Sequence, residues 1–236
     1  MRSWIYILVI GLTMSACTDS KQTGVTISVL EDVTETDFLA TPKAQSLVSK
    51  FDLFDNPWQF ARFRYGTMNS LIHNRRSELH IEGATALLGN QLIRDVEIAT
   101  FQKGIDSILN IPKNDKVYNY SSIWKPLVEE LKHLQKDTIS QTTLCVYSDL
   151  QENNGTWFSV HRYADLKLLE TNPKKVKALF LQRASNVLKG SSNINVVVVY
   201  QPQTMKQDKV FTMMKKLYSD VFAEMDISIE FVSHLN

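Results

Sequence analysis

Two apolar runs decide the fold of this chain: LCVY at residues 144–147 and INVVVVY at residues 194–200. Short continuous apolar runs of this kind are typical of strands that are buried on both faces of a sheet. The segment between them, residues 165–188, is largely helical in its periodicity, with an interruption near Asn172 and Pro173. Strands that alternate with helices of this length predict βαβ units and a parallel sheet.

The same alternation continues toward both ends of the chain. A first strand is expected at residues 25–30, and residues 60–65 and 78–81 form shorter, more polar runs that we interpret as an edge hairpin. Thr41 followed by Pro42 is typical of a helix start. We therefore predict an α/β fold: a doubly wound, mostly parallel sheet with one antiparallel edge strand and helices on both faces. Apolar spacing predicts further helices within residues 44–51, 92–108, 123–134 and 210–225, and a closing strand at residues 227–231.

Residues 1–16 predict a signal peptide rather than part of the fold. Arg2 supplies a positive charge, and residues 4–12 form an apolar segment that is too short to span a bilayer as a helix. The small residues that follow lead directly to Cys17, a pattern that resembles the lipobox of bacterial lipoproteins. This resemblance implies that cleavage leaves a diacylated Cys17 as the first residue of the mature protein. A plain secretory signal cut after Ala16 is the alternative.

A short polar segment then connects the lipid to one domain. Residues 17–24 are interpreted as the lipidated tether, and residues 25–236 as a single domain that is long enough to bury a full core. We expect a bacterial cell-envelope protein that is held at the membrane by its N-terminal lipid, with the choice of membrane leaflet left open.

The composition argues against nucleic acid as a partner. The chain has 26 basic and 25 acidic residues, and only Arg2 of these lies in the signal peptide, so the remainder is electrically neutral. A neutral chain offers no electrostatic footprint for nucleic acid. Cys145 is the one cysteine besides Cys17, so no internal disulfide is expected. Its place in an apolar run favours a buried thiol over a nucleophile.

Common catalytic and cofactor motifs are missing from the sequence. The five histidines show neither HxH nor HExxH spacing, and the eight glycines form neither GxGxxG nor GxxxxGK(S/T). A GxSxG motif is also missing. These absences argue against a transition-metal site, a phosphate-binding loop and a hydrolase elbow. We expect that the protein is not an enzyme.

Carboxylates and hydroxyls follow the predicted strands at the places where such sheets bind ligands. Asp32, Thr34 and Thr36 follow the first strand, Asp149 follows the strand at 144–147, and Ser121 precedes the helix at 123–134. In open α/β sheets, ligands bind at the carboxyl ends of the strands, near the point where the strand order reverses. Carboxylate, hydroxyl and water oxygens suit a hard cation, Mg²⁺ or Mn²⁺.

These residues resemble the metal-ion-dependent adhesion site (MIDAS) of the von Willebrand factor type A (vWA) domain. That family carries Asp-x-Ser/Thr-x-Ser/Thr after its first strand, a threonine in a later loop and an aspartate after its fourth strand. Asp32, Thr34 and Thr36 match the first motif, Ser121 takes the threonine position, and Asp149 matches the last aspartate. The resemblance covers residues 24–236 and implies a vWA/Rossmann-like fold.

The resemblance implies recognition of a protein partner rather than catalysis. Thr34 and Thr36 would bind the metal directly, and some contacts of Asp32 and Asp149 would pass through water. An acidic side chain of the partner would then displace a metal-bound water. Tyr120 and Trp157 are expected on the same rim as contacts for the partner. The alternative for Trp157 is that it packs under the helix that follows it.

Three departures from the family pattern leave other interpretations open. Leu150 stands where the family usually has glycine, Ser121 replaces threonine, and Glu31 adds a charge beside Asp32. The first alternative is therefore a degenerate, metal-free vWA scaffold or assembly subunit, in which the Asp and Thr residues only cap turns. The second is a Mg²⁺-dependent enzyme or a small-ligand receptor on a similar sheet.

Overall fold

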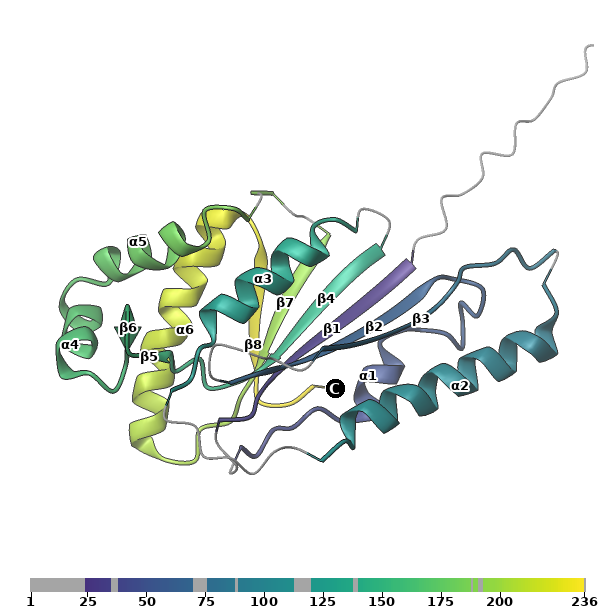
Figure 1. The fold of residues 1–236 in the computed structure, drawn as a ribbon, viewed down its shortest axis with the longest axis horizontal. Coiled ribbons are helices and arrows are strands. Elements are labelled where there is room, and N and C mark those ends of the chain that lie inside the picture. Colours follow the sequence, from purple (N-terminus) through teal and green to yellow (C-terminus); the bar gives the residue numbers. More distant parts are fainter. Residues whose placement is uncertain are drawn as a thin grey trace, which may run out of the picture.

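A six-stranded sheet forms the centre of the molecule (Figure 1). The computed structural model describes residues 24–34, 38–69, 76–87, 89–112, 120–137, 140–187, 189–190 and 193–235. The strand order is β3-β2-β1-β4-β7-β8; β3 pairs antiparallel with β2, and all other neighbours are parallel. The predicted fold class, with its antiparallel edge strand, is confirmed. The strands are β1 Gly24–Asp32, β2 Ala61–Met68, β3 Arg76–Ile81, β4 Ser140–Tyr147, β7 Ile194–Val199 and β8 Ser228–Val232.

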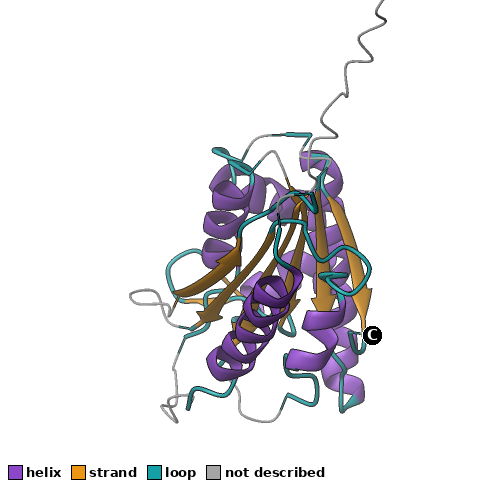
Figure 2. Ribbon diagram, turned by 90° about the vertical axis from the view of Figure 1, so that its right-hand side faces the viewer, coloured by secondary structure: helices purple, strands orange, loops and turns teal. Residues whose placement is uncertain are grey.

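Helices cover both faces of this sheet (Figure 2). Helices α1 and α2 pack on one face, and α3 to α6 pack on the other. A small hairpin, β5 Asn153–Asn154 and β6 Phe158–Ser159, lies between β4 and α4 in the chain. Among the described helices, none is both long and apolar enough to cross a membrane. The helices are α1 Ala44–Ser49, α2 Gln91–Leu109, α3 Trp124–Leu134, α4 Tyr163–Thr171, α5 Pro173–Arg183 and α6 Met205–Met225.

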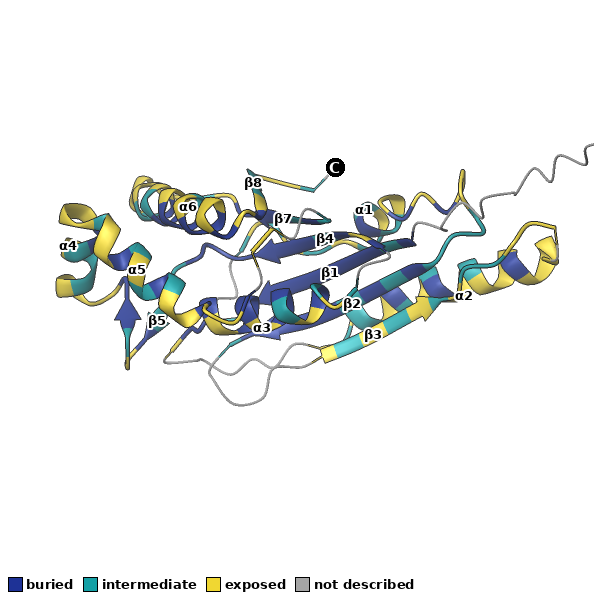
Figure 3. Cartoon of the chain, turned by 90° about the horizontal axis from the view of Figure 1, so that it is seen from above, coloured by how far each residue is buried: buried dark blue, intermediate teal, exposed yellow. Residues whose placement is uncertain are grey.

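The sheet separates two apolar cores. Alternation along the strands sends Val29 and Cys145 toward α1 and α2, whereas Leu30 and Val146 face α3 and α6. The central strands are buried almost throughout, while β3 alternates between exposed and half-buried residues (Figure 3). On the α3 face, Trp124 is buried among Phe180, Tyr218 and Phe222. The predicted buried strands are therefore the ones at the centre of the sheet.

The strand order reverses between β1 and β4. After β1 the chain passes α1 and continues to β2, whereas after β4 it passes α4 and α5 and continues to β7 on the other side. The two carboxyl ends are neighbours, because Glu31 pairs with Tyr147 in the β1–β4 ladder. This is the position at which a doubly wound sheet opens a crevice for ligands.

Two details of the predicted helices are wrong. Helix α1 begins at Ala44 with Lys43 as its N-cap, so Thr41 is not the cap. On α2, Leu92 and Val96 are exposed, although their spacing predicted a buried face. Arg94 is buried in their place, because its guanidinium donates to the carbonyl oxygens of Pro57, Glu82 and Gln59 at 2.5, 2.8 and 2.8 Å. Backbone carbonyl groups therefore decide which face is buried at the N-terminal end of α2. The spacing of apolar residues contains no information about such acceptors.

The α3 face of the sheet changes character toward β2 and β3. There the buried Glu130 of α3 accepts hydrogen bonds from Ser28 Oγ at 2.8 Å and from Arg64 Nε at 2.7 Å. Arg76 Nη1 lies 3.3 Å from the other carboxylate oxygen. Arg64 also pairs with Glu78 on β3. Charged side chains therefore replace the apolar core at this end of the sheet.

Candidate metal and partner-binding edge

Asp32 is the last residue of β1 and organises the turn that follows. Its Oδ1 atom accepts hydrogen bonds from the backbone N–H of Thr34 at 3.0 Å and from the Thr34 hydroxyl at 2.6 Å. Its Oδ2 atom accepts a hydrogen bond from the Ser148 hydroxyl at 3.0 Å. Asp32 is buried, and Ser148 is the first residue after β4. The carboxylate therefore ties together the ends of the two central strands.

The chain after β4 turns sharply around Asp149. Asp149 Oδ1 accepts the backbone N–H of Gln151 at 2.8 Å, and Ser148 Oγ accepts that of Leu150 at 3.0 Å. Leu150 has φ of 62°, in the left-handed region that usually favours glycine. Its side chain is fully buried in the α3-side core. The turn therefore has a backbone shape that glycine usually adopts, while its leucine side chain packs in the core.

Ser121 reaches the same cluster from the start of α3. Its Oγ atom lies 3.4 Å from the Thr34 hydroxyl, and its backbone exchanges two hydrogen bonds with Asn153 of the β5–β6 hairpin. Thr34 therefore contacts two other predicted site residues, Asp32 and Ser121. Asp149 is adjacent in sequence to Ser148, which contacts Asp32. Thr36 and Cys17 lie outside the described residues.

The oxygen atoms of this cluster fit a hard cation. Neighbouring ligands of an octahedral Mg²⁺ with bonds of 2.0–2.1 Å lie about 2.9 Å apart. Here the Thr34 hydroxyl is 2.6 Å from Asp32 Oδ1 and 3.4 Å from Ser121 Oγ. Because the Thr34 hydroxyl donates its single proton to Asp32, its oxygen keeps a lone pair for a metal even when it accepts a hydrogen bond from Ser121. Among the described residues, no group of three or more His, Cys, Asp or Glu side chains forms a metal site, so a cation here would need the hydroxyls.

Glu31 does not belong to this cluster. It is buried on the opposite face of the sheet from Asp32, and its Oε2 atom accepts a hydrogen bond from the Tyr65 hydroxyl at 2.6 Å. Successive residues of a strand point to opposite faces. The Glu31 carboxylate therefore lies on the face of the sheet that α1 and α2 cover and does not join the Asp32 cluster.

A third buried carboxylate, Glu152, lies three residues after Asp149 and bonds to the start of α3. One of its oxygens accepts the backbone N–H groups of Ile123 and Trp124, both at 2.8 Å, at the N-terminus of α3. Burial raises the pKa of Glu152 to about 7, although these N–H groups, Ser122 and Trp157 act in the opposite direction. Glu152 therefore fixes the loop after Asp149 to the helix that begins beside Ser121.

Tyr218 of α6 is buried near three carboxylates of this region, Glu152, Asp149 and Asp32. Burial raises the pKa of its phenol, and the charges of Glu152, Asp149 and Asp32 add to that rise. Among the described residues its hydroxyl has no hydrogen-bond partner, although it is fully buried. Burial of the Tyr218 hydroxyl without a hydrogen bond therefore costs free energy.

The two predicted rim residues differ in exposure and in the groups that they contact. Tyr120 is 53% exposed, and its ring lies against Gly155 at the tip of the hairpin. Trp157 is half-buried, and its ring centroid lies 4.8 Å from that of Phe180 on α5. Tyr120 is therefore exposed, whereas Trp157 packs against Phe180 of α5, the second helix after the hairpin.

Sequence reasoning did not assign a role to Ser148, Glu152 or Tyr218. Ser148 directly precedes Asp149 at a strand end, which was a usable signal for a further hydroxyl in the cluster. Glu152 and Tyr218 carried no such signal, because their positions depend on how the loop after β4 and helix α6 pack around α3.

Comparisons with known proteins find similarity only in structure. Neither a protein-family model nor a curated protein matches the sequence. The structure is similar to a crystal structure of the human COPII-coat protein Sec24c, with a TM-score of 0.39 and 12% sequence identity. The alignment covers 89% of this chain and 30% of that chain, so this protein spans under a third of the Sec24c length. The mostly parallel sheet with its antiparallel edge strand is compatible with a vWA-like domain.

Proposed function

We propose that this protein binds a protein partner at the carboxyl edge of its sheet, through a Mg²⁺ or Mn²⁺ ion at a MIDAS-like site. The observation that carries this proposal is the contact of Asp32 with Thr34 and Ser148, and of Thr34 with Ser121. These oxygen donors come from three separate segments and meet where the strand order reverses, which is the usual ligand position in such sheets.

Each side chain has a distinct role in this mechanism. The hydroxyls of Thr34 and Ser121 bind the cation, and Asp32 and Asp149 supply the negative charge that holds it. The hydroxyl ligands carry no charge, and some contacts of the two carboxylates would pass through water, so the ion would keep a coordination position for a water molecule. An acidic side chain of the partner would displace that water. Tyr120, exposed beside Ser121, offers that partner an aromatic contact.

Thermal unfolding tests the metal. The chain without its signal peptide and Cys17 (residues 18–236) is melted in EDTA, in Mg²⁺ and in Mn²⁺, beside a variant with Asp32→Asn and Thr34→Val. A ligand at a hundred times its Kd stabilises the native state by about 2.7 kcal/mol, so the wild type should melt higher with metal and the variant should not. Glu129→Gln, at an exposed position on α3, is the control that keeps the metal response.

Identical melting curves of the wild type in all three solutions would reject the metal and favour the second candidate, a metal-free scaffold. One observation favours that candidate: the Thr34 N–H and hydroxyl are both bonded to Asp32, so the turn is complete without a cation. A scaffold of this kind would still bind its partner in the presence of chelator.

The proposal places the protein at the cell envelope through a lipid on Cys17. The support for this is the sequence pattern of a short apolar segment followed by small residues and cysteine. Cys17→Ala should move the protein from the membrane fraction to the soluble fraction of the cell envelope. Retention in the membrane fraction would reject the lipid anchor.

A further inference from the structure

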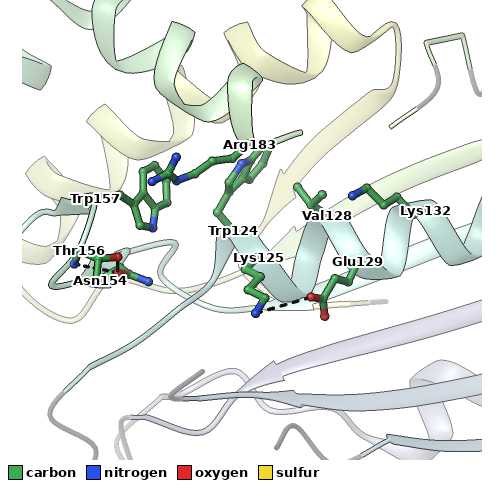
Figure 4. Close-up of a pocket in the computed structure, with 9 residues that line it drawn as sticks. All are labelled: Trp124, Lys125, Val128, Glu129, Lys132, Asn154, Thr156, Trp157 and Arg183. Atoms are coloured by element: carbon green, nitrogen blue, oxygen red, sulfur yellow. Dashed lines mark hydrogen bonds and ion pairs between the residues drawn. The ribbon is translucent and has the colours of Figure 1, made fainter. Parts of the chain in front are cut away.

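A separate pocket lies beside the β5–β6 hairpin, and Tyr120 is not among its lining residues. It has a volume of about 380 Å³ and lies between α3, the hairpin and the C-terminal end of α5 (Figure 4). This volume is at the lower end of the range for sites that bind small ligands or single side chains. The hairpin joins the pocket to the edge described above, because Asn153 pairs with Ser121 while the next residue, Asn154, lines the pocket.

One wall of the pocket is apolar and rigid. Trp124 and Val128, one turn apart on α3, form this wall together with Trp157 of the hairpin. Trp124 is fixed by its indole N–H, which donates to the Phe180 carbonyl at 3.0 Å. Trp157 is fixed by the ring of Phe180 and by the Arg183 guanidinium, which lies 4.5 Å from its ring centroid. Such a preformed aromatic wall can receive an apolar side chain with little loss of conformational freedom.

The remaining lining carries an excess of positive charge. Lys125 and Glu129 lie one turn apart on α3 and pair with each other at 4.0 Å. Lys132 and Arg183 also line the pocket, and neither forms an ion pair among the described residues. Two cations without a carboxylate partner therefore stand beside the aromatic wall (Figure 4).

We propose that this pocket binds a segment of a protein partner in which an acidic residue stands next to an aromatic residue. The aromatic side chain lies against Trp157 and Val128, and the carboxylate pairs with Arg183 and Lys132. Charge complementarity selects the acidic residue, because a carboxylate supplies the counter-charge that the pocket lacks. The small volume excludes a helix, so the occupant is a short segment whose two neighbouring side chains both enter the pocket.

This inference rests on the proposed protein-binding function but is independent of the metal. The pocket and the Asp32 cluster share the hairpin and α3, whereas their lining side chains are different. A partner that binds at the edge could therefore place a neighbouring segment in the pocket, and the two contacts can be tested one at a time.

Peptide titration tests the pocket directly. The ¹⁵N-labelled full chain in detergent is titrated with the capped peptide Gly-Phe-Asp-Phe-Gly, and the indole N–H signals of Trp157 and Trp58 are followed. Trp58 lies beside Arg94 on the α2 side and serves as the internal reference. We expect a saturable shift of the Trp157 signal in the millimolar range. The matched peptide with Asn in place of Asp should bind about fivefold more weakly, the effect of a partly exposed ion pair.

Variants distinguish this proposal from the metal site. Arg183→Gln and Lys132→Gln should each weaken peptide binding by about fivefold without changing the melting response to Mg²⁺. Lys174→Gln, an exposed position on the same helix as Arg183, should leave peptide binding unchanged. Asp32→Asn should abolish the Mg²⁺ response and leave peptide binding unchanged.

Several outcomes would overturn the proposal. Equal affinity for the Asp and Asn peptides would remove the charge argument, and a peptide that shifts Trp58 as much as Trp157 would show non-specific binding. Phenylacetate that binds as tightly as the peptide would identify a pocket for small aromatic anions rather than for a protein segment.

Discussion

Two buried carboxylates at helix α3, Glu152 and Glu130, have different kinds of hydrogen-bond and charge partners. Glu152 lies at the N-terminus of α3 and accepts the backbone N–H groups of Ile123 and Trp124. Glu130 lies within the helix and is paired with Arg64 and Arg76 from β2 and β3. Both carboxylates are almost inaccessible to water, with exposed fractions of 0% and 3%. Their surroundings therefore differ in the charge of the partners and hardly in burial.

The two pKa values move in opposite directions for this reason. Burial is the largest influence on both groups and raises the pKa of each. At Glu130, the hydrogen bonds and charges of Arg64, with Ser28 and Arg76, outweigh burial and lower the pKa. At Glu152, hydrogen bonds alone do not outweigh burial, and the pKa rises to about 7. The cations beside Glu130, which Glu152 lacks among its pKa influences, therefore account for the opposite directions of these two pKa values.

The largest effect is expected from removing the charge of Glu130. Glu130→Gln leaves Arg64 without its buried partner, and breaking a buried ion pair from one side typically costs 3–5 kcal/mol. Urea unfolding at pH 7.5 measures this loss. Glu129→Gln, on the exposed side of the same helix, should change the free energy of unfolding by less than about 0.5 kcal/mol. A loss at Glu130 as small as that of the control would show that the network contributes no stability.

The second effect is a dependence of stability on pH, whose sign for Glu152 is opposite to its sign for Glu130. Because its pKa is raised from 4.5 to about 7, folded Glu152 holds a proton that the unfolded chain releases. Its contribution to stability is therefore present below pH 4.5 and lost as the pH rises through about 7. A shift of this size corresponds to about 3 kcal/mol. Glu130, with its lowered pKa, loses stability in the opposite direction, as the pH falls.

Glu152→Gln should isolate this dependence. The variant keeps an oxygen that can accept the N–H groups of α3 but does not titrate. Relative to the wild type, it should gain about 3 kcal/mol between pH 4.5 and pH 8 in urea unfolding. Parallel stability curves for the two proteins would show that Glu152 does not titrate in this range.

The smallest effect concerns the backbone between Asp149 and Glu152. Leu150→Ala and Leu150→Gly both remove the buried side chain, but only glycine relieves the left-handed φ of 62°. The glycine variant should therefore be about 1 kcal/mol more stable than the alanine variant. Leu144 is buried in the middle of β4 and serves as the control. There the alanine variant should be more stable than the glycine variant by about 0.5–1 kcal/mol. An alanine variant that is the more stable at both positions would show that the turn is unstrained.

Sequence patterns predicted the fold better than the details of the site. Continuous apolar runs identified β4 and β7, because strands covered on both faces need apolar residues throughout. The shorter, more polar runs at residues 60–65 and 78–81 indicated the edge hairpin, because an edge strand is less completely covered than a central one. The spacing of apolar residues on α2 predicted the wrong buried face at its N-terminal end. Arg94 is buried there because its guanidinium binds backbone carbonyl groups.

For the candidate site, the sequence alone indicated which strand ends carry carboxylates and hydroxyls. Strand alternation and the positions of Asp32 and Asp149 required no knowledge of distant contacts. Only the tertiary structure decided that Glu31 accepts a hydrogen bond from Tyr65, that Ser148 bonds to Asp32, and that Glu152 accepts the N–H of Trp124. It also decided the pocket beside Trp157 and the opposite states of Glu130 and Glu152. Those properties depend on partners more than twenty residues away, and local sequence does not encode which distant groups meet.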